Sequence, residues 1–384
     1  MKKCSFIFII LFLFNIVNIN AIGYVYNNTD NFLTPSEVKV GSYKFTDGSI
    51  YYGEIKGRKP YGNGKTVFTN GDVYEGEYVR GLRSGEGTLS YSHGGKYIGH
   101  WDDNQRSGNG IYYFANNNCY EGLWLKDCQN GKGVMHYHNG DIYEGSWKSD
   151  KREGNGVYSW ANGTKYEGSW KNDKKEGKGL ISWTDGSFYD GDWHNDVRDG
   201  KGTFQYTNRD KYVGNWKNDL QDGFGIYYFH TGDRYEGSYQ LGERTGRGIY
   251  YHTNGNKYEG DFRNGMLYGN GVFTWTNGAV YRGNWKNSKR EGYGSYKWSN
   301  GDVYSGNWLN DSPNGEGTLT TINGEKYVGG FDNGFKNGYG IQIDKDGNIY
   351  DGYFEKGLMN GSFVVKDKNG KIIWRGTYKS GTRL

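Results

Sequence analysis

Aromatic residues and glycines recur along most of the chain at a fixed spacing, with short polar stretches between them. The pattern Tyr-x-Gly-x-aromatic begins at Tyr51 and returns every 23 residues as far as Tyr350, and a further copy begins at Trp374. The position four residues after the first residue of the pattern is aromatic in 14 of 15 copies, with Ile55 as the exception. Such a period predicts a repeat array, in which each unit packs mainly against its neighbours.

Within one repeat, the alternation of side chains predicts two short antiparallel strands. Tyr166, Gly168 and Trp170 share one face of the first strand, because alternate residues of a strand point to opposite sides. A Gly-x-Gly motif lies eleven residues after the tyrosine and belongs to the same face of the next strand, except in the last unit, which has Gly361-Ser-Phe363. We therefore expect rings to cover glycines across the strands.

Two kinds of connection are predicted between these strands. Asn-Gly or Asp-Gly usually ends three residues before the tyrosine, as in Asn162-Gly163, and favours a tight type I′ turn that joins one repeat to the next. Asn117 and Arg209 replace this glycine in two repeats. The six polar residues after the second aromatic, such as 171–176, predict a longer loop at the opposite edge.

These features together predict an all-β fold, an elongated, twisted, single-layer antiparallel sheet of stacked β-hairpins. The repeat array is expected over residues 41–378, after a linker at 22–40 and before a C-terminal tail at 379–384. Residues 1–21 are typical of a signal peptide, because a basic start precedes an apolar run shorter than the ~20 residues of a membrane span. A signal peptide cleaved after Ala21 is favoured over an uncleaved anchor, and either would send the remainder into the secretory pathway.

The repeat resembles that of the MORN (membrane occupation and recognition nexus) family. The family pattern, YEGxWxxGxxxGxGxxxxxxG in outline, is nearly literal in Tyr166-Glu-Gly-Ser-Trp170 and the following Gly177-Lys-Gly179, and about fifteen in-phase copies carry it. The resemblance implies a non-catalytic scaffold that tethers protein partners near membranes, with phospholipid binding. Familiar members act in the cytoplasm, whereas the signal peptide favours a lumenal, secreted or surface scaffold here.

Composition and charge narrow the classes of function. The chain has 66 glycines, three prolines and 18% aromatic residues, which favours ordered strands over a disordered or collagen-like chain. Its net charge of +4 is too balanced to indicate nucleic-acid binding.

The polar loops nevertheless carry a net positive charge, which predicts a mildly basic edge that could meet an anionic phospholipid surface, a polyanionic glycan or an acidic partner. An ordinary solvated edge is the alternative. The candidate residues of the basic edge are Lys148, Lys151, Arg152, Lys171, Lys174, Lys175, Lys286, Lys289 and Arg290.

The aromatic face suggests a second function, the binding of carbohydrate or another ligand along an aromatic groove. This hypothesis requires exposed rings in the middle repeats. The candidate residues are Tyr143, Trp147, Tyr166, Trp170, Tyr189, Trp193, Tyr212 and Trp216.

No catalytic, cofactor or metal site is predicted. Gly62-Asn-Gly64-Lys65-Thr66 is similar to the end of a phosphate-binding loop, but the glycine that such a loop requires at position 59 is a lysine. The expected partners are therefore proteins, including a second copy of this chain in a dimer or higher oligomer, and not nucleic acid.

Two cysteines and four sequons remain. Cys119 and Cys128 lie in one repeat and are either a disulfide pair or two incidental thiols. The sequons predict N-glycosylation at Asn27, Asn162, Asn310 and Asn360.

Overall fold

The computed structural model describes residues 37–384, so the predicted signal peptide and most of the predicted linker lie outside the described residues. These described residues form strands and turns and contain no helix. None of them therefore forms a helix long and apolar enough to span a membrane. The chain divides between Gly177 and Lys178 into two compact units.

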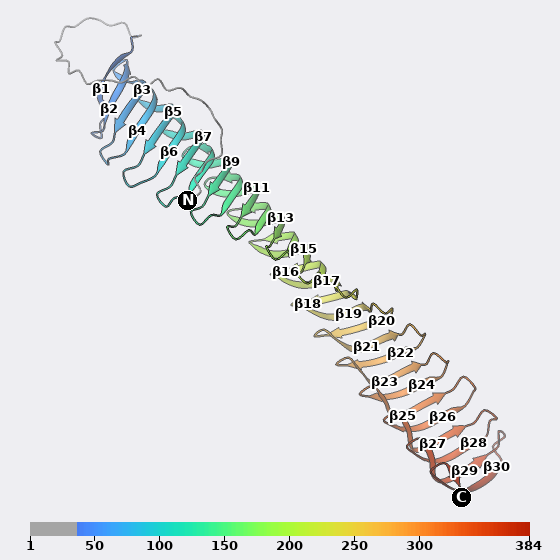
Figure 1. The fold of residues 1–384 in the computed structure, drawn as a ribbon. Helices are drawn as coiled ribbons and strands as arrows, with labels where there is room; N and C mark the ends of the chain where they lie inside the picture. Colours follow the sequence, from blue (N-terminus) through green and yellow to red (C-terminus); the bar gives the residue numbers. More distant parts are fainter. Residues whose placement is uncertain (1–36) are drawn as a thin grey trace, which may run out of the picture. The chain divides into compact units, whose positions relative to one another are not determined.

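The strands of each unit pair antiparallel with their neighbours in sequence order, and Figure 1 shows them side by side in that order. This arrangement confirms the predicted all-β array of hairpins. The first unit contains β1 (Lys39–Lys44), β2 (Ile50–Lys56), β3 (Lys59–Val67), β4 (Val73–Val79), β5 (Leu82–Ser90), β6 (Lys96–Asp102), β7 (Gln105–Tyr113), β8 (Cys119–Leu125), β9 (Cys128–His136), β10 (Ile142–Lys148), β11 (Lys151–Ser159), β12 (Lys165–Lys171) and the start of β13 (Lys174–Ser182).

The second unit continues the same succession of short and long strands. It contains the rest of β13 and β14 (Phe188–His194), β15 (Val197–Gln205), β16 (Lys211–Lys217), β17 (Leu220–Tyr228), β18 (Arg234–Gln240), β19 (Glu243–Tyr251), β20 (Lys257–Arg263), β21 (Met266–Thr274), β22 (Val280–Lys286), β23 (Lys289–Lys297), β24 (Val303–Leu309), β25 (Ser312–Thr320), β26 (Lys326–Asp332), β27 (Phe335–Ile343), β28 (Ile349–Glu355), β29 (Leu358–Lys366), β30 (Ile372–Lys379) and β31 (Thr382–Arg383).

A row of facing glycines fixes how closely the strands and rings approach. Gly145 of β10 faces Gly133 of β9 on one side and Gly156 of β11 on the other. A Cβ atom added at Gly156 would clash with the hydroxyl group and ring of Tyr143. The repeated glycine is therefore required where a ring lies directly on the backbone, which confirms the predicted covering of glycine by aromatic rings.

The Asn-Gly connection is not the type I′ turn that the sequence predicted. Trp160 N–H donates to the Thr164 carbonyl at 2.9 Å, and Gly163 N–H donates to the Trp160 carbonyl at 2.9 Å. Gly163 has a φ of 94°, whereas the two residues before it have negative φ, so this is a three-residue loop with a glycine bulge. Asn117 and Arg209 occupy the glycine position with φ of 65° and 71°.

The segment predicted as a long polar loop is instead the tight turn. Ser149 and Asp150 have φ of 48° and 66°, as a type I′ turn requires, and the flanking Lys148 and Lys151 face each other as the last strand pair. The prediction was wrong because the strand ends carry exposed polar side chains at this edge, and such residues are as typical of loops as of solvated strand ends.

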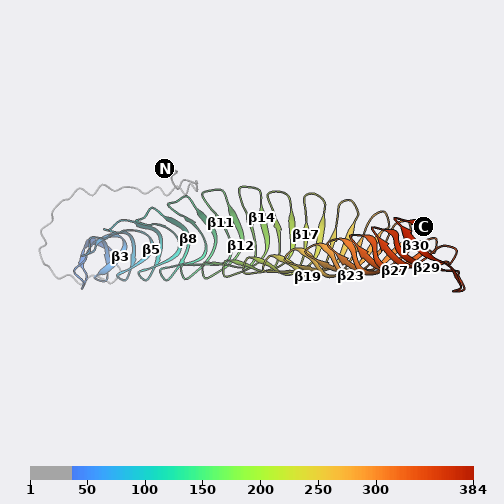
Figure 2. The same cartoon turned by 90° about the horizontal axis from the view of Figure 1, so that it is seen from below.

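Each hairpin bends at the Gly-x-Gly motif. Gly145 faces Gly156 but Trp147 faces Arg152, so one residue of β10 lies opposite three residues of β11. The first glycine of the motif, Gly154, has a φ of 74° within this irregularity. Figure 2 shows the strands of the first unit curved rather than straight. The bend gives each hairpin a concave inner face, which holds the rings, and an outer face.

The C-terminal segment differs from the predicted tail. The short strand β31 pairs with β30, and the Arg383 guanidinium lies 4.2 Å from the centre of the Trp374 ring. The array therefore extends past residue 378.

Candidate functional site

Within each unit, the inner face is a ladder of rings that joins neighbouring repeats. Tyr143 is fully buried and meets the ring of Trp147 edge to face at 5.1 Å and the ring of Trp170, one repeat later, at 5.5 Å. Its hydroxyl donates to the Ser146 carbonyl at 3.0 Å, and burial raises the pKa of Tyr143. Trp170 Nε1 donates to the Gly156 carbonyl at 3.3 Å. Ring pairs of this kind contribute ~0.5–1.5 kcal/mol each beyond area burial.

This ladder contains every residue that the sequence proposed for ligand binding on the aromatic face, and it buries all of them. The four tyrosines are 0% exposed and the four tryptophans are 5% exposed. The residues are Tyr143, Trp147, Tyr166, Trp170, Tyr189, Trp193, Tyr212 and Trp216. Their burial does not provide the exposed ring faces that the ligand-binding hypothesis requires.

A second row of rings lies beside the ladder and is only half-buried. In the second unit Phe204 contacts Tyr206 at 4.5 Å, and Tyr206 contacts Tyr227 of the next repeat at 5.8 Å. The aromatic residues found in most repeats seventeen positions after the first tyrosine are the sequence signal for this row. The row also serves packing between repeats.

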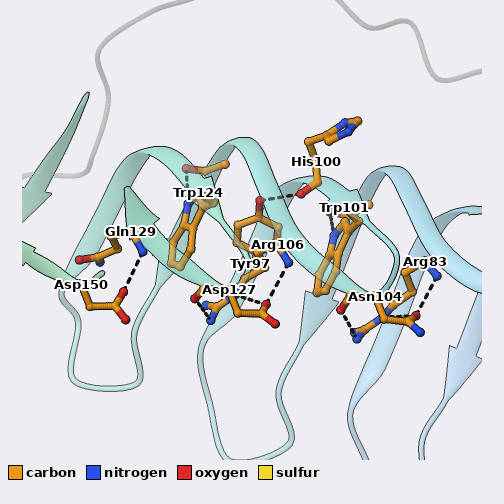
Figure 3. A network of polar contacts seen from close by, with 12 residues as sticks. Arg83, Tyr97, His100, Trp101, Asn104, Arg106, Trp124, Asp127, Gln129 and Asp150 are labelled. Atoms are coloured by element: carbon orange, nitrogen blue, oxygen red, sulfur yellow. Dashed lines mark hydrogen bonds and ion pairs between the residues drawn. The ribbon is translucent and has the colours of Figure 1, made fainter. Parts of the chain in front are cut away.

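An arginine clasp joins consecutive repeats near the type I′ turns. The Arg106 guanidinium lies 4.3 Å from the centre of the Trp124 ring, and its Nε donates to Asp127 Oδ1 at 3.0 Å. Its Nη2 donates to the Asp127 carbonyl at 2.7 Å. Figure 3 shows this arrangement and its counterpart one repeat earlier, where Arg83 binds Asn104. We use the name arginine clasp for this set and its equivalents at Arg152, Arg198 and Arg290.

The clasp removes two residues from the predicted basic edge. Arg152 and Arg290 have side chains only 18% and 21% exposed, because each binds the aspartate of the next turn and stacks on the next tryptophan. Lys175 also lies over a ring, 5.7 Å from the centre of Tyr166. Counting charges along the sequence could not reveal this internal use. The lysines that stay exposed are Lys148, Lys151, Lys171, Lys174, Lys286 and Lys289.

An aspartate clasp joins repeats at the opposite edge. Asp210, with a side chain 9% exposed, accepts hydrogen bonds from the His230 backbone N–H at 2.7 Å and from the Tyr227 hydroxyl at 2.8 Å. Burial opposes its ionisation, but these bonds and the His230 ring outweigh burial and lower the pKa of Asp210 to about 2. Asp141 repeats the arrangement with Ala161 and Tyr158. The sequence interpretation missed this role.

The outer face of the first unit carries a groove of about 1100 Å³, which we call the outer groove. Its floor is the backbone of the glycine row, because on this face the side chains stand only on either side of the glycines. In Figure 3, His100 points to this outer side, away from the rings of Tyr97 and Trp124. One wall of the groove contains Ile98, Ile111, Glu121, Val134, Glu144, Val157 and Glu167, and the other contains Glu86, Asn109, Lys132 and Asn155.

The disulfide considered for Cys119 and Cys128 does not form within the chain. Cys119 faces His136 at one end of the β8–β9 hairpin and Cys128 faces Leu125 at the other, so the two thiols are not bonded to each other. The six-residue offset along β8 corresponds to ~20 Å, well beyond the ~7 Å that bridged Cα atoms allow. In residues 37–384 no group of three His, Cys, Asp or Glu side chains could hold a metal ion.

The predicted sequons fall in different surroundings. Asn162 and Asn310 are exposed in turns, whereas Asn360 is half-buried and its Nδ2 donates to Glu355 Oε2 at 2.5 Å. Asn27 lies outside the described residues. Glycosylation at these positions stays a prediction.

The repeat matches a known family. The protein-family model described as MORN repeat matches thirteen consecutive segments, from residues 74–96 to residues 350–362. A search of the curated proteins gives no significant match.

Several solved structures are matched with low identity. The TCP domain of Drosophila melanogaster SAS-4, solved with a proline-rich motif of Ana2, is 18% identical over 40% of this chain and 85% of that chain, with a TM-score of 0.27. The TCP10 domain of Danio rerio CPAP is 12% identical over 70% of this chain and 99% of that chain, with a TM-score of 0.18. At these TM-scores the resemblance supports no conclusion about function.

Proposed function

Because this chain belongs to the MORN repeat family, we propose that it is a non-catalytic scaffold that presents protein-binding surfaces along its hairpins. The observation that carries the proposal is that the side chains of the inner face join the repeats, whereas charged side chains of the outer face remain exposed. Rings, clasp arginines and clasp aspartates are used to join repeats, while charged side chains of the outer face and the turns stay exposed. A surface of this kind recurs with every repeat, as a scaffold requires.

Protein capture tests the scaffold. The chain from residue 22 onward is expressed with an affinity tag, and proteins joined to it by a short cross-linker are quantified by mass spectrometry. Light scattering on the purified chain tests self-association. We expect specific partners, a second copy among the candidates. A chain that stays monomeric and enriches no protein above a tag-only control contradicts the proposal.

Entry into the secretory pathway belongs to the same proposal and rests on the apolar run after Lys2 and Lys3. We expect the mature protein to begin after Ala21 and to be secreted, lumenal or bound to a surface membrane. Amino-terminal sequencing of the protein from its native source tests this. A mature chain that retains Met1 and stays in the cytosol contradicts it.

The exposed lysines favour a second candidate function, binding to an anionic membrane surface. Lys148 and Lys151 flank one turn of the first unit, Lys171 and Lys174 flank the next, and all four are exposed. A lysine near an anionic bilayer contributes ~1 kcal/mol, and salt weakens the attraction. We expect flotation with phosphatidylserine vesicles to be lost when all four are changed to alanine and kept in Lys132→Ala. Equal flotation with neutral vesicles contradicts this function.

A further inference from the structure

The outer groove places glutamates at a regular interval. Glu121 and Glu144 both face Val134, from β8 and β10, and Glu144 and Glu167 both face Val157, from β10 and β12. Neighbouring glutamates in this row are therefore two strands apart, which corresponds to ~9.6 Å. Figure 1 shows these strands in the green part of the ribbon, within the first unit.

Two of these glutamates have no partner in residues 37–384. Glu121 and Glu144 make no hydrogen bond or ion pair there, and both are exposed. The residues two positions earlier, which share their strand face, are Cys119 and Ile142 and carry no charge. One wall of the groove therefore has uncompensated negative charge. Lys132, on the other wall, is the one cation among the residues that line the groove.

The equivalent glutamates of the second unit are neutralised. Glu236 lies 3.1 Å from Arg234, and Glu259 lies 2.9 Å from Lys257. These pairs occupy the same positions of the repeat and differ because the residue two positions earlier is a cation. Glu167, the third glutamate of the row, is likewise paired with Lys165 at 3.3 Å. The uncompensated charge of the outer groove thus belongs to the repeats of Glu121 and Glu144 and is not a requirement of the repeat.

We propose that the outer groove binds an extended, basic segment of a partner protein that carries Lys or Arg at every third residue. The inference rests on the proposed scaffold function and names its site and the chemistry of its partner. In the extended polyproline II conformation a chain has three residues per turn and rises ~3.1 Å per residue, so every third side chain returns to the same side at ~9.3 Å, close to the spacing of the glutamates. The groove spans β5 to β12, or ~34 Å, which accommodates about ten extended residues.

The remaining residues of the groove fit the same occupant. Ile98, Ile111 and Val157 offer aliphatic surface against which the methylene stems of Lys or Arg can pack. Lys132 repels cations from the second wall, so the basic side chains are directed toward the glutamates. Asn109 and Asn155 supply amide groups to the backbone of the segment.

The test uses the chain from residue 22 onward and two labelled ten-residue peptides in fluorescence anisotropy at low ionic strength. One peptide has lysine at every third position with serine and valine between, and the other has the same composition with its lysines in one block. We expect the spaced peptide to bind more tightly and to lose affinity with added salt. Equal affinity for the two peptides, or no saturable binding, overturns the proposal.

Two matched double variants test whether the peptide binds at the outer groove. Glu121→Gln/Glu144→Gln is expected to weaken binding of the spaced peptide about 5-fold, from two exposed ion pairs. Glu236→Gln/Glu259→Gln, at the same repeat positions in the second unit, is expected to leave binding unchanged. An equal loss of affinity in both variants overturns the proposal. The proposal is also overturned if spermine competes with the peptide and Glu121→Gln/Glu144→Gln weakens spermine binding as much as it weakens binding of the spaced peptide, because the effect is then a general attraction of cations.

Partner capture separates this inference from the scaffold function. If the cross-linked partners of the unmodified chain are retained by Glu121→Gln/Glu144→Gln and the peptides do not bind, the outer groove is excluded and the scaffold stands. If the spaced peptide binds as expected but no partner is captured, the groove is supported and the scaffold fails.

Discussion

Two parts of the second unit, residues 189–311 and residues 312–384, share the ring ladder but join their repeats differently. In the first part Arg290 stacks on Trp308 at 4.4 Å and binds Asp311. In the second part Lys336 takes the arginine position and Gly357 the aspartate position. The comparison teaches that the rings and glycines are the constant part of the repeat, whereas the clasps can be replaced.

Lys336 shows what the replacement changes. Its Nζ lies 4.9 Å from the centre of the Tyr327 ring and donates to Gln342 Oε1 at 2.8 Å. Burial lowers the pKa of Lys336, and no carboxylate of residues 37–384 lies at hydrogen-bonding distance to offset this effect. Gln342 stands on the ring side of its strand, opposite Tyr327, where most repeats have an apolar residue. The opposite edge changes as well, since Asn348 binds Asp344 of its own turn rather than the next repeat.

The largest expected loss of stability is the same in both parts, because it comes from substitutions in the ring ladder that both parts share. Gly271→Ala places a Cβ against the Tyr258 ring, and Gly340→Ala places one against the Tyr327 ring. We expect each change to destabilise its repeats by about 3 kcal/mol through overpacking. Native-state hydrogen exchange measures this strand by strand, with Thr274→Ala as an exposed control. A loss confined to one part would show that the ladder is not the common element.

Acid titration distinguishes the two parts next. Asp210 has a folded pKa of about 2 against an ordinary value of 3.8, so its ionised form stabilises the fold above pH ~4, and this contribution is lost as the pH falls through 2. The shift corresponds to about 2 kcal/mol. We expect Asp210→Asn to destabilise its repeats at pH 7 and to flatten the acid dependence, measured by exchange or by thermal unfolding from pH 2 to 6. Asn348→Ala is the control, and an equal loss there contradicts the comparison.

Arginine replacements test the clasp itself. Arg290→Ala is expected to cost about 1–2 kcal/mol, because it removes ring packing and charge-assisted bonds to Asp311. Arg290→Lys should recover only part of this, since an ammonium group cannot make the two parallel contacts of the guanidinium. The reciprocal Lys336→Arg should gain little, because position 357 offers no carboxylate. Thermal melting with exchange readout checks all three, and full rescue by lysine would contradict a clasp.

The smallest effect concerns the charge of Lys336. Its lowered pKa means that the charged amine opposes folding at neutral pH, and that this cost falls as the pH rises through the folded pKa toward 10.5. We expect Lys336→Met to be neutral or slightly stabilising at pH 7. The advantage over the unmodified chain should shrink between pH 8 and pH 10. A growing advantage over that range would show that Lys336 is stabilised by an anionic partner.

The period of 23 residues was sufficient to predict the strands, their faces and the covering of glycine by rings. It was not sufficient for the turns, because Ser149 and Asp150 have positive φ only in the context of a long strand pair, which local composition does not reveal. Nor did it separate the clasp residue Arg152 from the exposed Lys151 beside it. That difference depends on a tryptophan and an aspartate contributed by the following repeat.

The outer groove illustrates a different limit of sequence reading. Glu121, Glu144 and Glu167 are exposed, as charged side chains usually are, and the sequence alone does not distinguish their surroundings. Such a glutamate is neutralised where a cation stands two positions earlier, as for Glu236 and Glu259, or directly across the strands, as Lys65 does for Glu75. The residues that neutralise these glutamates are not part of the repeated pattern, so the repeat alone does not predict which glutamates are paired.

The reach of the clasps has a consequence for how such a chain can vary in length. The arginine clasp spans 21 residues from Arg198 to Asp219, and the aspartate clasp spans 20 from Asp210 to His230. No clasp therefore extends beyond the adjoining repeat. Duplication or deletion of 23 residues within either unit would recreate the same junctions on both sides, while a change of one residue would reverse every inward and outward side chain after it. The fold can therefore gain or lose whole repeats without changing the contacts between the repeats that remain.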